Sequence, residues 1–174
     1  ISPFQDGGKP IKRSGAMDDI AILFNNVFQQ NKLSVATAES CTSGQVAACI
    51  TSVPGASVFF KGGVVAYSNE VKEQVLGVGR DTLEAHGAVS EEMVRGVRQL
   101  MNVRCAVATS GIAGPGGGLP TKPVGTIWTA VAFDDKVLTF KLTGDRGREE
   151  NVRKTVRFVL MQLLKLVSAE ENRA

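Results

Sequence analysis

The chain has few of the residues on which several classes of protein depend. Its 174 residues include one histidine and three cysteines, Cys41, Cys49 and Cys105. The cysteines show no metal-ligand spacing, and one histidine cannot complete a Cys/His zinc set. We therefore expect no metal, and no cofactor is indicated. An odd number of cysteines without a disulfide framework suits a reducing cytoplasm, which is the location we expect.

Long apolar runs and an excess of one charge are missing as well. No run reaches the roughly 18 apolar residues that a membrane span needs, and the polar N-terminus has no secretory signal. The net charge is +3, but residues 1–16 hold three basic residues and one acidic residue, so most of the excess lies there. We expect no nucleic acid or membrane partner, and any anion site must be local.

The first segment of the chain differs from the rest. Residues 1–16 contain glycine, proline and basic residues without any periodicity. We interpret them as a leader left from cloning, and the alternative is a native flexible arm. Residues 17–168 show no internal repeat or linker and are expected to form one domain. Residues 169–174 are polar and are expected to fray.

Helical and strand patterns alternate along the body of the chain. Apolar spacing predicts a first helix, β-branched runs predict strands, and Asp134-Asp135-Lys136 predicts a hairpin. Ser68, Asp81 and Ser90 are predicted to cap helices. Gly62-Gly63 is predicted to form a bulge or to allow close approach of another part of the chain. The pattern favours an α/β fold with a mixed sheet. The predicted helices are 17–30, 41–52, 68–76, 81–87, 90 onward and 152–167, and the strands are 33–38, 58–67, 105–109, 124–133 and 137–142.

Ser40 is the first candidate for chemistry. It lies in Ala38-Glu39-Ser40-Cys41-Thr42-Ser43-Gly44, where a predicted buried strand ends and a predicted helix begins. A hydroxyl at such a turn meets unpaired backbone N–H groups, which can stabilise the oxyanion of acyl transfer. The alternatives are that Ser40 or Thr42 only caps the helix, or that Cys41 is the nucleophile.

A serine nucleophile needs a base, and Tyr67-Ser68-Asn69-Glu70-Val71-Lys72 offers two candidates, Lys72 and Tyr67. The only histidine, His86, precedes Gly87 and is interpreted as the end of a helix, where the dipole favours a cation. A partly desolvated Lys72 could act as the base instead, with Tyr67 nearby. The alternative for Lys72 is an ordinary solvated lysine.

Two further segments could bind the polar part of a substrate. Gly111–Gly118 contains five glycines and no charge, so its backbone could enclose a phosphate or lie against a flat ring. It matches neither a Walker A loop nor a dinucleotide fingerprint, and a structural turn is the alternative. After Gly144-Asp145, the arginines could contact a phosphate or belong to a solvated helix start. These are Arg146, Arg148 and Arg153.

Taken together, these segments resemble the CinA C-terminal domain family, whose stand-alone members are the nicotinamide mononucleotide deamidases (PncC). The resemblance extends from about Met17 to Val167. The stretches that carry it are Ala36–Gly44, Gly63–Lys72, Leu83–Ser90, Ser110–Gly118, Lys122–Thr126 and Gly144-Asp145-Arg146.

The resemblance implies a three-layer α/β/α domain, often a homo-oligomer, that converts nicotinamide mononucleotide and water to nicotinate mononucleotide and ammonia. It implies Ser40 as nucleophile, Lys72 as base and Tyr67 as a helper in proton transfer. The expected oxyanion and substrate-binding residues are Thr42, Ser43, Gly44, Gly111, Gly114, Gly116, Arg146 and Arg153.

The chain departs from the family pattern at two places. Ser43 replaces the first glycine of the usual Cys-Thr-Gly-Gly and adds a Cβ. The spacing after Arg146 is longer than usual, which leaves the phosphate ligand open among the three arginines. Many family members also carry an N-terminal pyrophosphatase domain, for which we expect no room here. A non-catalytic nucleotide-binding or regulatory module is the alternative function.

Overall fold

The computed structural model describes residues 15–85 and 89–173. Five strands form one mixed sheet in the order β2-β1-β3-β4-β5. Strand β1 pairs in parallel with both β2 and β3, whereas β3–β4 and β4–β5 are antiparallel. The strands are β1 (Val35–Glu39), β2 (Phe60–Val65), β3 (Cys105–Gly111), β4 (Ile127–Phe133) and β5 (Lys136–Leu142). The predicted mixed sheet and hairpin are confirmed.

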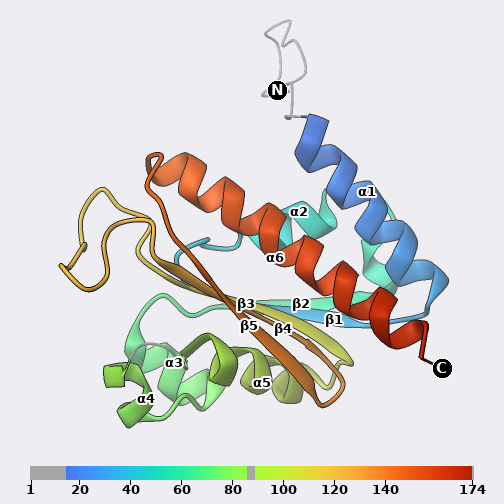
Figure 1. The fold of residues 1–174 in the computed structure, drawn as a ribbon. Coiled ribbons are helices and arrows are strands. Elements are labelled where there is room, and N and C mark those ends of the chain that lie inside the picture. The colour runs from blue at the N-terminus through green and yellow to red at the C-terminus, as the bar shows by residue number, and fades with distance from the viewer. Residues whose placement is uncertain (1–14, 86–88, 174) are drawn as a thin grey trace, which may run out of the picture.

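Helices cover both faces of the sheet, so the domain has three layers, as the family resemblance implied (Figure 1). Helices α1 (Gly15–Gln30), α2 (Gln45–Thr51) and α6 (Arg148–Glu171) lie on one face. Helices α3 (Asn69–Leu76), α4 (Arg80–Ala85) and α5 (Val89–Met101) lie on the other, and a 3-10 turn, Ala56–Val58, precedes β2. No helix within the described ranges is long and apolar enough to cross a membrane.

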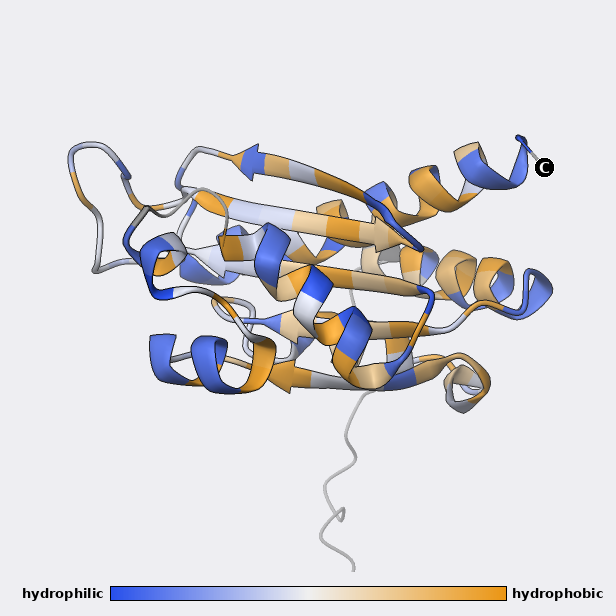
Figure 2. Cartoon of the chain, turned by 90° about the horizontal axis from the view of Figure 1, so that it is seen from below, coloured by the Kyte–Doolittle hydropathy of each residue, from blue (hydrophilic) through white to orange (hydrophobic). Residues whose placement is uncertain are grey.

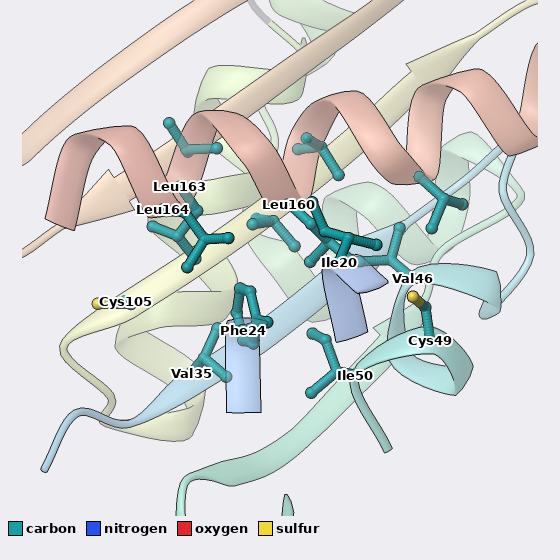
Figure 3. Packing of buried hydrophobic residues seen from close by; sticks show 14 of the residues in the cluster. Ile20, Phe24, Val35, Val46, Cys49, Ile50, Cys105, Leu160, Leu163 and Leu164 are labelled. Carbon is teal, nitrogen blue, oxygen red and sulfur yellow. The ribbon is translucent and has the colours of Figure 1, made fainter. Parts of the chain in front are cut away.

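Each face of the sheet has its own apolar core, because side chains alternate between faces along every strand. On the α1–α2–α6 face, Phe24, Val35 and Leu160 are fully buried and pack together (Figure 3). On the α3–α5 face the strands contribute mainly alanines, which allows α5 to lie close to the sheet. In Figure 2, where this layer faces the viewer, each helix carries both hydrophilic and hydrophobic residues, as expected of amphipathic helices.

Strand β2 contains the predicted irregularity. Val35 pairs with Phe60 but Ala36 pairs with Gly62, so Lys61 is the extra residue of a bulge. At Gly63, a Cβ would lie 2.1 Å from the Thr37 hydroxyl, so this position also needs glycine for close approach. Both parts of the prediction for Gly62-Gly63 are confirmed.

Of the three predicted helix caps, one is confirmed and two are wrong. Ser68 caps α3, since its hydroxyl accepts from the Val71 N–H at 3.2 Å. Asp81 and Ser90 are not caps, because α4 begins at Arg80 and α5 at Val89, one residue ahead of each. The error has a simple cause: both residues lie in the first turn, where acidic and small polar residues are also common. The predicted helix end at His86-Gly87 falls outside the described residues.

The ends of the domain differ from the predicted boundaries by a few residues. Helix α1 begins at Gly15, two residues before the expected start of the domain, and residues 1–14 lie outside the described part. Helix α6 continues through Glu171, three residues into the segment predicted to fray. Lys136 on β5 pairs with Glu170 at 3.0 Å, which ties this last turn to the sheet.

Candidate active site

Ser40 lies directly after the central parallel strand β1. Its N–H donates to the Thr109 carbonyl on β3 at 3.0 Å, so the ladder between the two strands continues by one residue. Continued alternation from Ala36 and Ala38 assigns Ser40 to the face that α3–α5 cover. The residue is buried and its hydroxyl makes no hydrogen bond within the described part of the chain. The backbone of Ser40 is therefore fixed, while its hydroxyl remains available to a substrate or a base.

The turn after Ser40 is longer than the sequence suggested. Residues 41–44 form a turn and α2 begins only at Gln45, so the helix predicted from residue 41 starts four residues too early. Ser43 and Gly44 both have left-handed backbone conformations, with φ of 53° and 93°. Residues with a left-handed backbone cannot continue a right-handed helix, so α2 begins only after Gly44. Ser40 consequently does not lie at the first turn of α2.

Glu39 occupies the start of α2 instead. Its side chain is 1% exposed and accepts hydrogen bonds from the Val46 N–H at 2.7 Å and the Ala47 N–H at 3.1 Å. The Thr42 hydroxyl donates to the same carboxylate at 2.6 Å. Because its single proton is used there, Thr42 accepts from the Thr109 hydroxyl, 2.7 Å away. A carboxylate at a helix N-terminus is favourable, and this one occupies the donors expected to serve an oxyanion.

The predicted oxyanion donors are thus reduced to a few backbone groups. The Ser43 N–H donates to the Ser40 carbonyl at 3.1 Å and so closes the turn. The N–H groups of Thr42 and Gly44 make no hydrogen bond with any described residue. The Thr42 side chain is fully buried and holds the turn, so substrate contact by its hydroxyl is not supported. Ser43 is exposed, and only its backbone takes part in the turn.

Lys72 projects from α3 into the layer on the same face as Ser40. The residue is 7% exposed, and its amine has no hydrogen bond or carboxylate partner among the described residues. Burial lowers the pKa of Lys72 from its usual value, because desolvation penalises the ammonium form. A buried lysine without a partner lowers the stability of a fold, so its presence here favours a functional role.

Cys41, the rival nucleophile, has a different environment. Its side chain is buried within the cluster on the opposite face of the sheet, together with Val46 and Cys49. Burial raises the pKa of the Cys41 thiol to about 11, although the ammonium of Lys72 acts in the opposite direction. Two conclusions follow. The thiol stays protonated at neutral pH, and Lys72 lies close enough to the 40–41 turn for its charge to be felt there.

A cavity of about 260 Å³ lies beside Lys72, at the end of the sheet where β3 finishes. Its wall includes Ser110 and Trp128, which are direct neighbours in the β3–β4 register. The β1–β3 register pairs Glu39 with Thr109, and the Ser40 N–H bond to Thr109 continues it toward Ser110, but Ser40 itself does not line the cavity. The loop between β3 and β4, yellow to orange in Figure 1, projects from this end of the sheet. The remaining lining residues are Asn69, Leu83, Val89, Gly111, Ile112, Gly117, Leu119 and Lys122.

Tyr67 lies at the surface and is held by an arginine. It follows β2 at the same end of the sheet, is 58% exposed, and accepts a hydrogen bond from Arg148 at 3.2 Å. The same guanidinium donates to the Gly114 carbonyl at 2.7 Å. Arg148 therefore joins the segment after β2 to the glycine-rich loop, a role that the sequence did not reveal.

The three predicted glycines have different environments. Gly111 lines the cavity, with a φ of 149°, and a Cβ there would lie 2.4 Å from the Thr126 carbonyl oxygen. At Gly114, a Cβ would meet Val124 at 2.2 Å, so packing within the loop requires glycine. Gly116 has open space around it. Neither Gly114 nor Gly116 lines the cavity, so only Gly111 lies where the prediction needs it.

The predicted arginines do not gather around the cavity. Arg146 is exposed, and only its backbone is anchored, by donation to the Asn151 side chain at 2.9 Å. Arg153 lies on α6 on the other side of the sheet, within 4.0 Å of Glu149 and Glu150. Its outward position follows from α6 geometry, because the neighbouring Val152 faces the core. The structure thus separates Arg153 from Lys72.

Of the eleven residues that line the cavity, only Lys72 and Gly111 were predicted as site residues, and three of the others matter most for its chemistry. Ser110, Lys122 and Trp128 line the cavity, although the first two occur in stretches that carry the family resemblance. Position at the carboxyl end of a predicted strand could have singled out Ser110, because parallel strands bring such ends together. Nothing local distinguishes Lys122 or Trp128. Within the described ranges, no group of three His, Cys, Asp or Glu side chains could hold a metal ion.

The structure is an α/β domain with a cavity at the end of the sheet where the parallel strand β3 finishes. Residues 18–167 match the CinA C-terminal domain, and the chain belongs to that family. A CinA-like protein of Amoebophilus asiaticus is 43% identical over 152 residues, which is 85% of this chain and 36% of that protein. A CinA-like protein of Cytophaga hutchinsonii is 48% identical over 136 residues, 76% of this chain and 32% of that protein. The chain spans about a third of the length of these curated relatives.

Solved structures show the same fold. The competence/damage inducible protein CihA from Agrobacterium tumefaciens superposes with a TM-score of 0.84 at 38% identity, covering 87% of this chain and 96% of that one. A competence-damaged protein (CinA) superfamily protein from Klebsiella pneumoniae gives a TM-score of 0.83 at 31% identity, covering 88% and 98%. The family and the α/β architecture predicted from the sequence are both confirmed.

The Glu39 contacts predict a large loss of stability on removal of the charge. Glu39→Gln places an amide NH₂ where donors now converge, so at least one buried N–H or the Thr42 hydroxyl loses its acceptor. We expect a loss of about 2 kcal/mol in the free energy of unfolding, measured by urea denaturation. Glu84→Gln, at an exposed carboxylate of α4, is the matched control and should change stability by less than about 0.5 kcal/mol. Equal stability of the two variants would contradict the assigned contacts.

The backbone at Ser43 predicts a gain in stability from glycine. A non-glycine residue in the left-handed region costs about 1–2 kcal/mol, and the extra freedom of glycine in the unfolded chain offsets roughly 0.5–1 kcal/mol of that. Ser43→Gly should therefore raise the free energy of unfolding by up to about 1 kcal/mol, measured by thermal or urea denaturation. Ser52→Gly, at a right-handed helix end, should destabilise instead, and a loss of stability in Ser43→Gly would show that the left-handed turn is wrong.

Proposed function

We propose that this domain hydrolyses the carboxamide of nicotinamide mononucleotide, with Ser40 as the nucleophile and Lys72 as the base. The observation that carries the proposal is the buried, unpartnered amine of Lys72 in the layer toward which Ser40 is directed. Burial favours the neutral amine, which is the form that can accept a proton. The family match supports the proposal at the level of the domain, and the particular reaction follows from the resemblance to the deamidases.

The first half of the proposed reaction forms an acyl-enzyme. The Lys72 amine takes the proton from the Ser40 hydroxyl as its oxygen attacks the carboxamide carbon. Negative charge develops on the carboxamide oxygen, and the free N–H groups of Thr42 and Gly44 are the donors available to it. One such donor is worth about 3–4 kcal/mol in the barrier. The Lys72 ammonium then protonates the nitrogen of the leaving group, which departs as ammonia.

The second half releases the acid. Neutral Lys72 takes a proton from water, whose oxygen attacks the acyl carbon. The bond to Ser40 breaks, and the serine oxygen recovers its proton from Lys72. Nicotinate mononucleotide leaves, and the enzyme returns to its starting state. We assign to Tyr67, whose hydroxyl accepts a hydrogen bond from Arg148 at 3.2 Å, the relay of a proton or the orientation of the entering substrate.

Two alternatives give different outcomes. A cysteine-dependent hydrolase would use Cys41, yet the raised pKa of about 11 and the burial in the opposite core disfavour a thiolate. A non-catalytic nucleotide-binding or regulatory module would keep the cavity and show no turnover. The position of Lys72 favours the enzyme over the module, because its amine lies in the layer on the same face of the sheet as Ser40, the candidate nucleophile. Homo-oligomeric assembly stays a prediction.

The first test removes the two adjacent candidates for nucleophile one at a time. Ser40→Ala should lower ammonia release from nicotinamide mononucleotide by at least about 1,000-fold, because no attacking oxygen remains. Cys41→Ala is the matched neighbour and should keep activity within a few-fold of the parent protein. The measurement is an ammonia assay at saturating substrate, accompanied by substrate binding to show that each variant still folds.

The outcomes separate the three candidates. Loss of activity in Cys41→Ala but not in Ser40→Ala would assign the reaction to the thiol. No ammonia from the parent protein, despite binding of the nucleotide, would leave the non-catalytic module as the function. Parallel reactions with nicotinamide and nicotinamide riboside show which part of the substrate the cavity requires.

The second test uses pH. Because only the neutral Lys72 amine accepts a proton, kcat/KM should rise with pH through the pKa of Lys72 and then level off. Burial lowers that pKa, so the plateau should begin well below the value of roughly 10.4 for an exposed lysine. Lys72→Arg, which keeps the charge but cannot deprotonate, should abolish the reaction. An active Lys72→Arg variant, or a kcat/KM that does not fall at any acidic pH at which the protein stays folded, would contradict a lysine base.

A further inference from the structure

Lys122 is the second lysine of the cavity, and its amine is left without any acceptor. The Nζ atom is shielded from solvent and makes no hydrogen bond with a described residue. The amine lies over the face of Trp128, whose ring centre is 5.6 Å away. Desolvation, and after it the Lys141 ammonium, lower the pKa of Lys122. A buried amine with unused donors is rare in native folds and needs an explanation.

The backbone around Lys122 is fixed, so the amine is held at this place. Lys122 and Leu119 exchange two backbone hydrogen bonds, of 2.8 and 3.0 Å, across a tight turn of the loop. At the base of the loop, Ile112 accepts from Gly125 and donates to Thr126. The loop that carries Lys122 is thus closed onto the end of β3, beside Ser110 and Gly111 of the cavity wall.

The charges around the cavity favour an anion at this end. Lys72 and Lys122 both line it, and no carboxylate does so among the described residues. Lys141, next to Trp128 in the β4–β5 register, adds a third positive charge over the same ring. A cationic pyridinium ring would be repelled from Trp128 by these two ammonium groups. A phosphate would satisfy the unused donors of Lys122.

We propose that Lys122, held over Trp128, binds the phosphate group of the nucleotide, so that the carboxamide lies at the Lys72 end of the cavity. The assignment of the nucleotide rests on the function proposed above, whereas the anion site rests on the cavity alone. It differs from the prediction from the sequence, in which an arginine after β5 has this role. Lys122 thereby becomes a specificity residue, and it discriminates nicotinamide mononucleotide from the riboside that lacks the phosphate.

Binding tests the site without any turnover. Trp128 is the only tryptophan of the chain, so its fluorescence reports events at this wall of the cavity. Titration with ribose 5-phosphate should change the fluorescence of the parent protein, and Lys122→Met should weaken that binding about tenfold or more. Lys165→Met is the matched control, because Lys165 is an exposed lysine of α6, on the other face of the sheet, and does not line the cavity. It should bind within about threefold of the parent protein.

Kinetics tests the role in specificity. With nicotinamide mononucleotide, Lys122→Met should raise KM about tenfold or more and leave kcat within a few-fold. With the riboside, the variant and the parent protein should be equal. Inorganic phosphate should compete with the nucleotide for the parent protein but not for Lys122→Met, which separates a site for any phosphate from one that also needs the ribose.

The outcomes keep the two proposals distinct. If ribose 5-phosphate binds through Lys122 but no ammonia forms from the nucleotide, the amidase proposal fails and the anion site stands. If ribose 5-phosphate does not bind, or binds Lys122→Met as well as the parent protein, the anion site is overturned whatever the activity. A Lys122→Arg variant that restores binding would show that the charge, and not the shape of the loop, is responsible.

Discussion

The buried carboxylate of Glu39 is the contact on which the arrangement of the site depends. It accepts from the first turn of α2 and from Thr42, whose hydroxyl is in turn supported by Thr109 on β3. A buried charge is tolerated only when several donors satisfy it, and here three do. Because the Glu39 carboxylate accepts the N–H groups at the start of α2, it caps this helix. Ser40, the next residue, is therefore not needed as the cap.

On the opposite face of the sheet, charged groups in the described part of the chain are left without hydrogen-bond partners. Three donors satisfy the Glu39 carboxylate, whereas the amines of Lys72 and Lys122 are buried or shielded without partners among the described residues. Unpaired amines lower the stability of a fold, and they do so here within one cavity that has no carboxylate on its described wall. Uncompensated positive charge in a concave site matches an anionic substrate, which would supply the missing partner on binding.

Local patterns explain which parts could be predicted from the sequence. The strands, the hairpin and the cap at Ser68 depend on neighbours within a few residues, and each was predicted. The bulge at Lys61 depends on pairing with β1, and it was predicted only because paired glycines are a local sign of such an irregularity. The start of α2 was not, because it depends on the left-handed turn at Ser43 and on the Glu39 contacts. Thr42 and Thr109 are 67 residues apart, so no window of sequence shows their hydrogen bond. Lys122 and Trp128 were not predicted as site residues for the same reason, because only the folded structure shows that they line the cavity.

Alternation across the sheet decides between two adjacent nucleophiles that the sequence left open. Cys41 packs into the α1–α2–α6 core, where burial keeps its thiol protonated. Ser40 continues the opposite set of side chains, above the layer that contains Lys72. A nucleophile needs a base on its own side of the sheet, and the buried amine of Lys72 lies on that side without a partner among the described residues. The serine is therefore the better candidate although the thiol is intrinsically more reactive, because position determines which group can lose its proton.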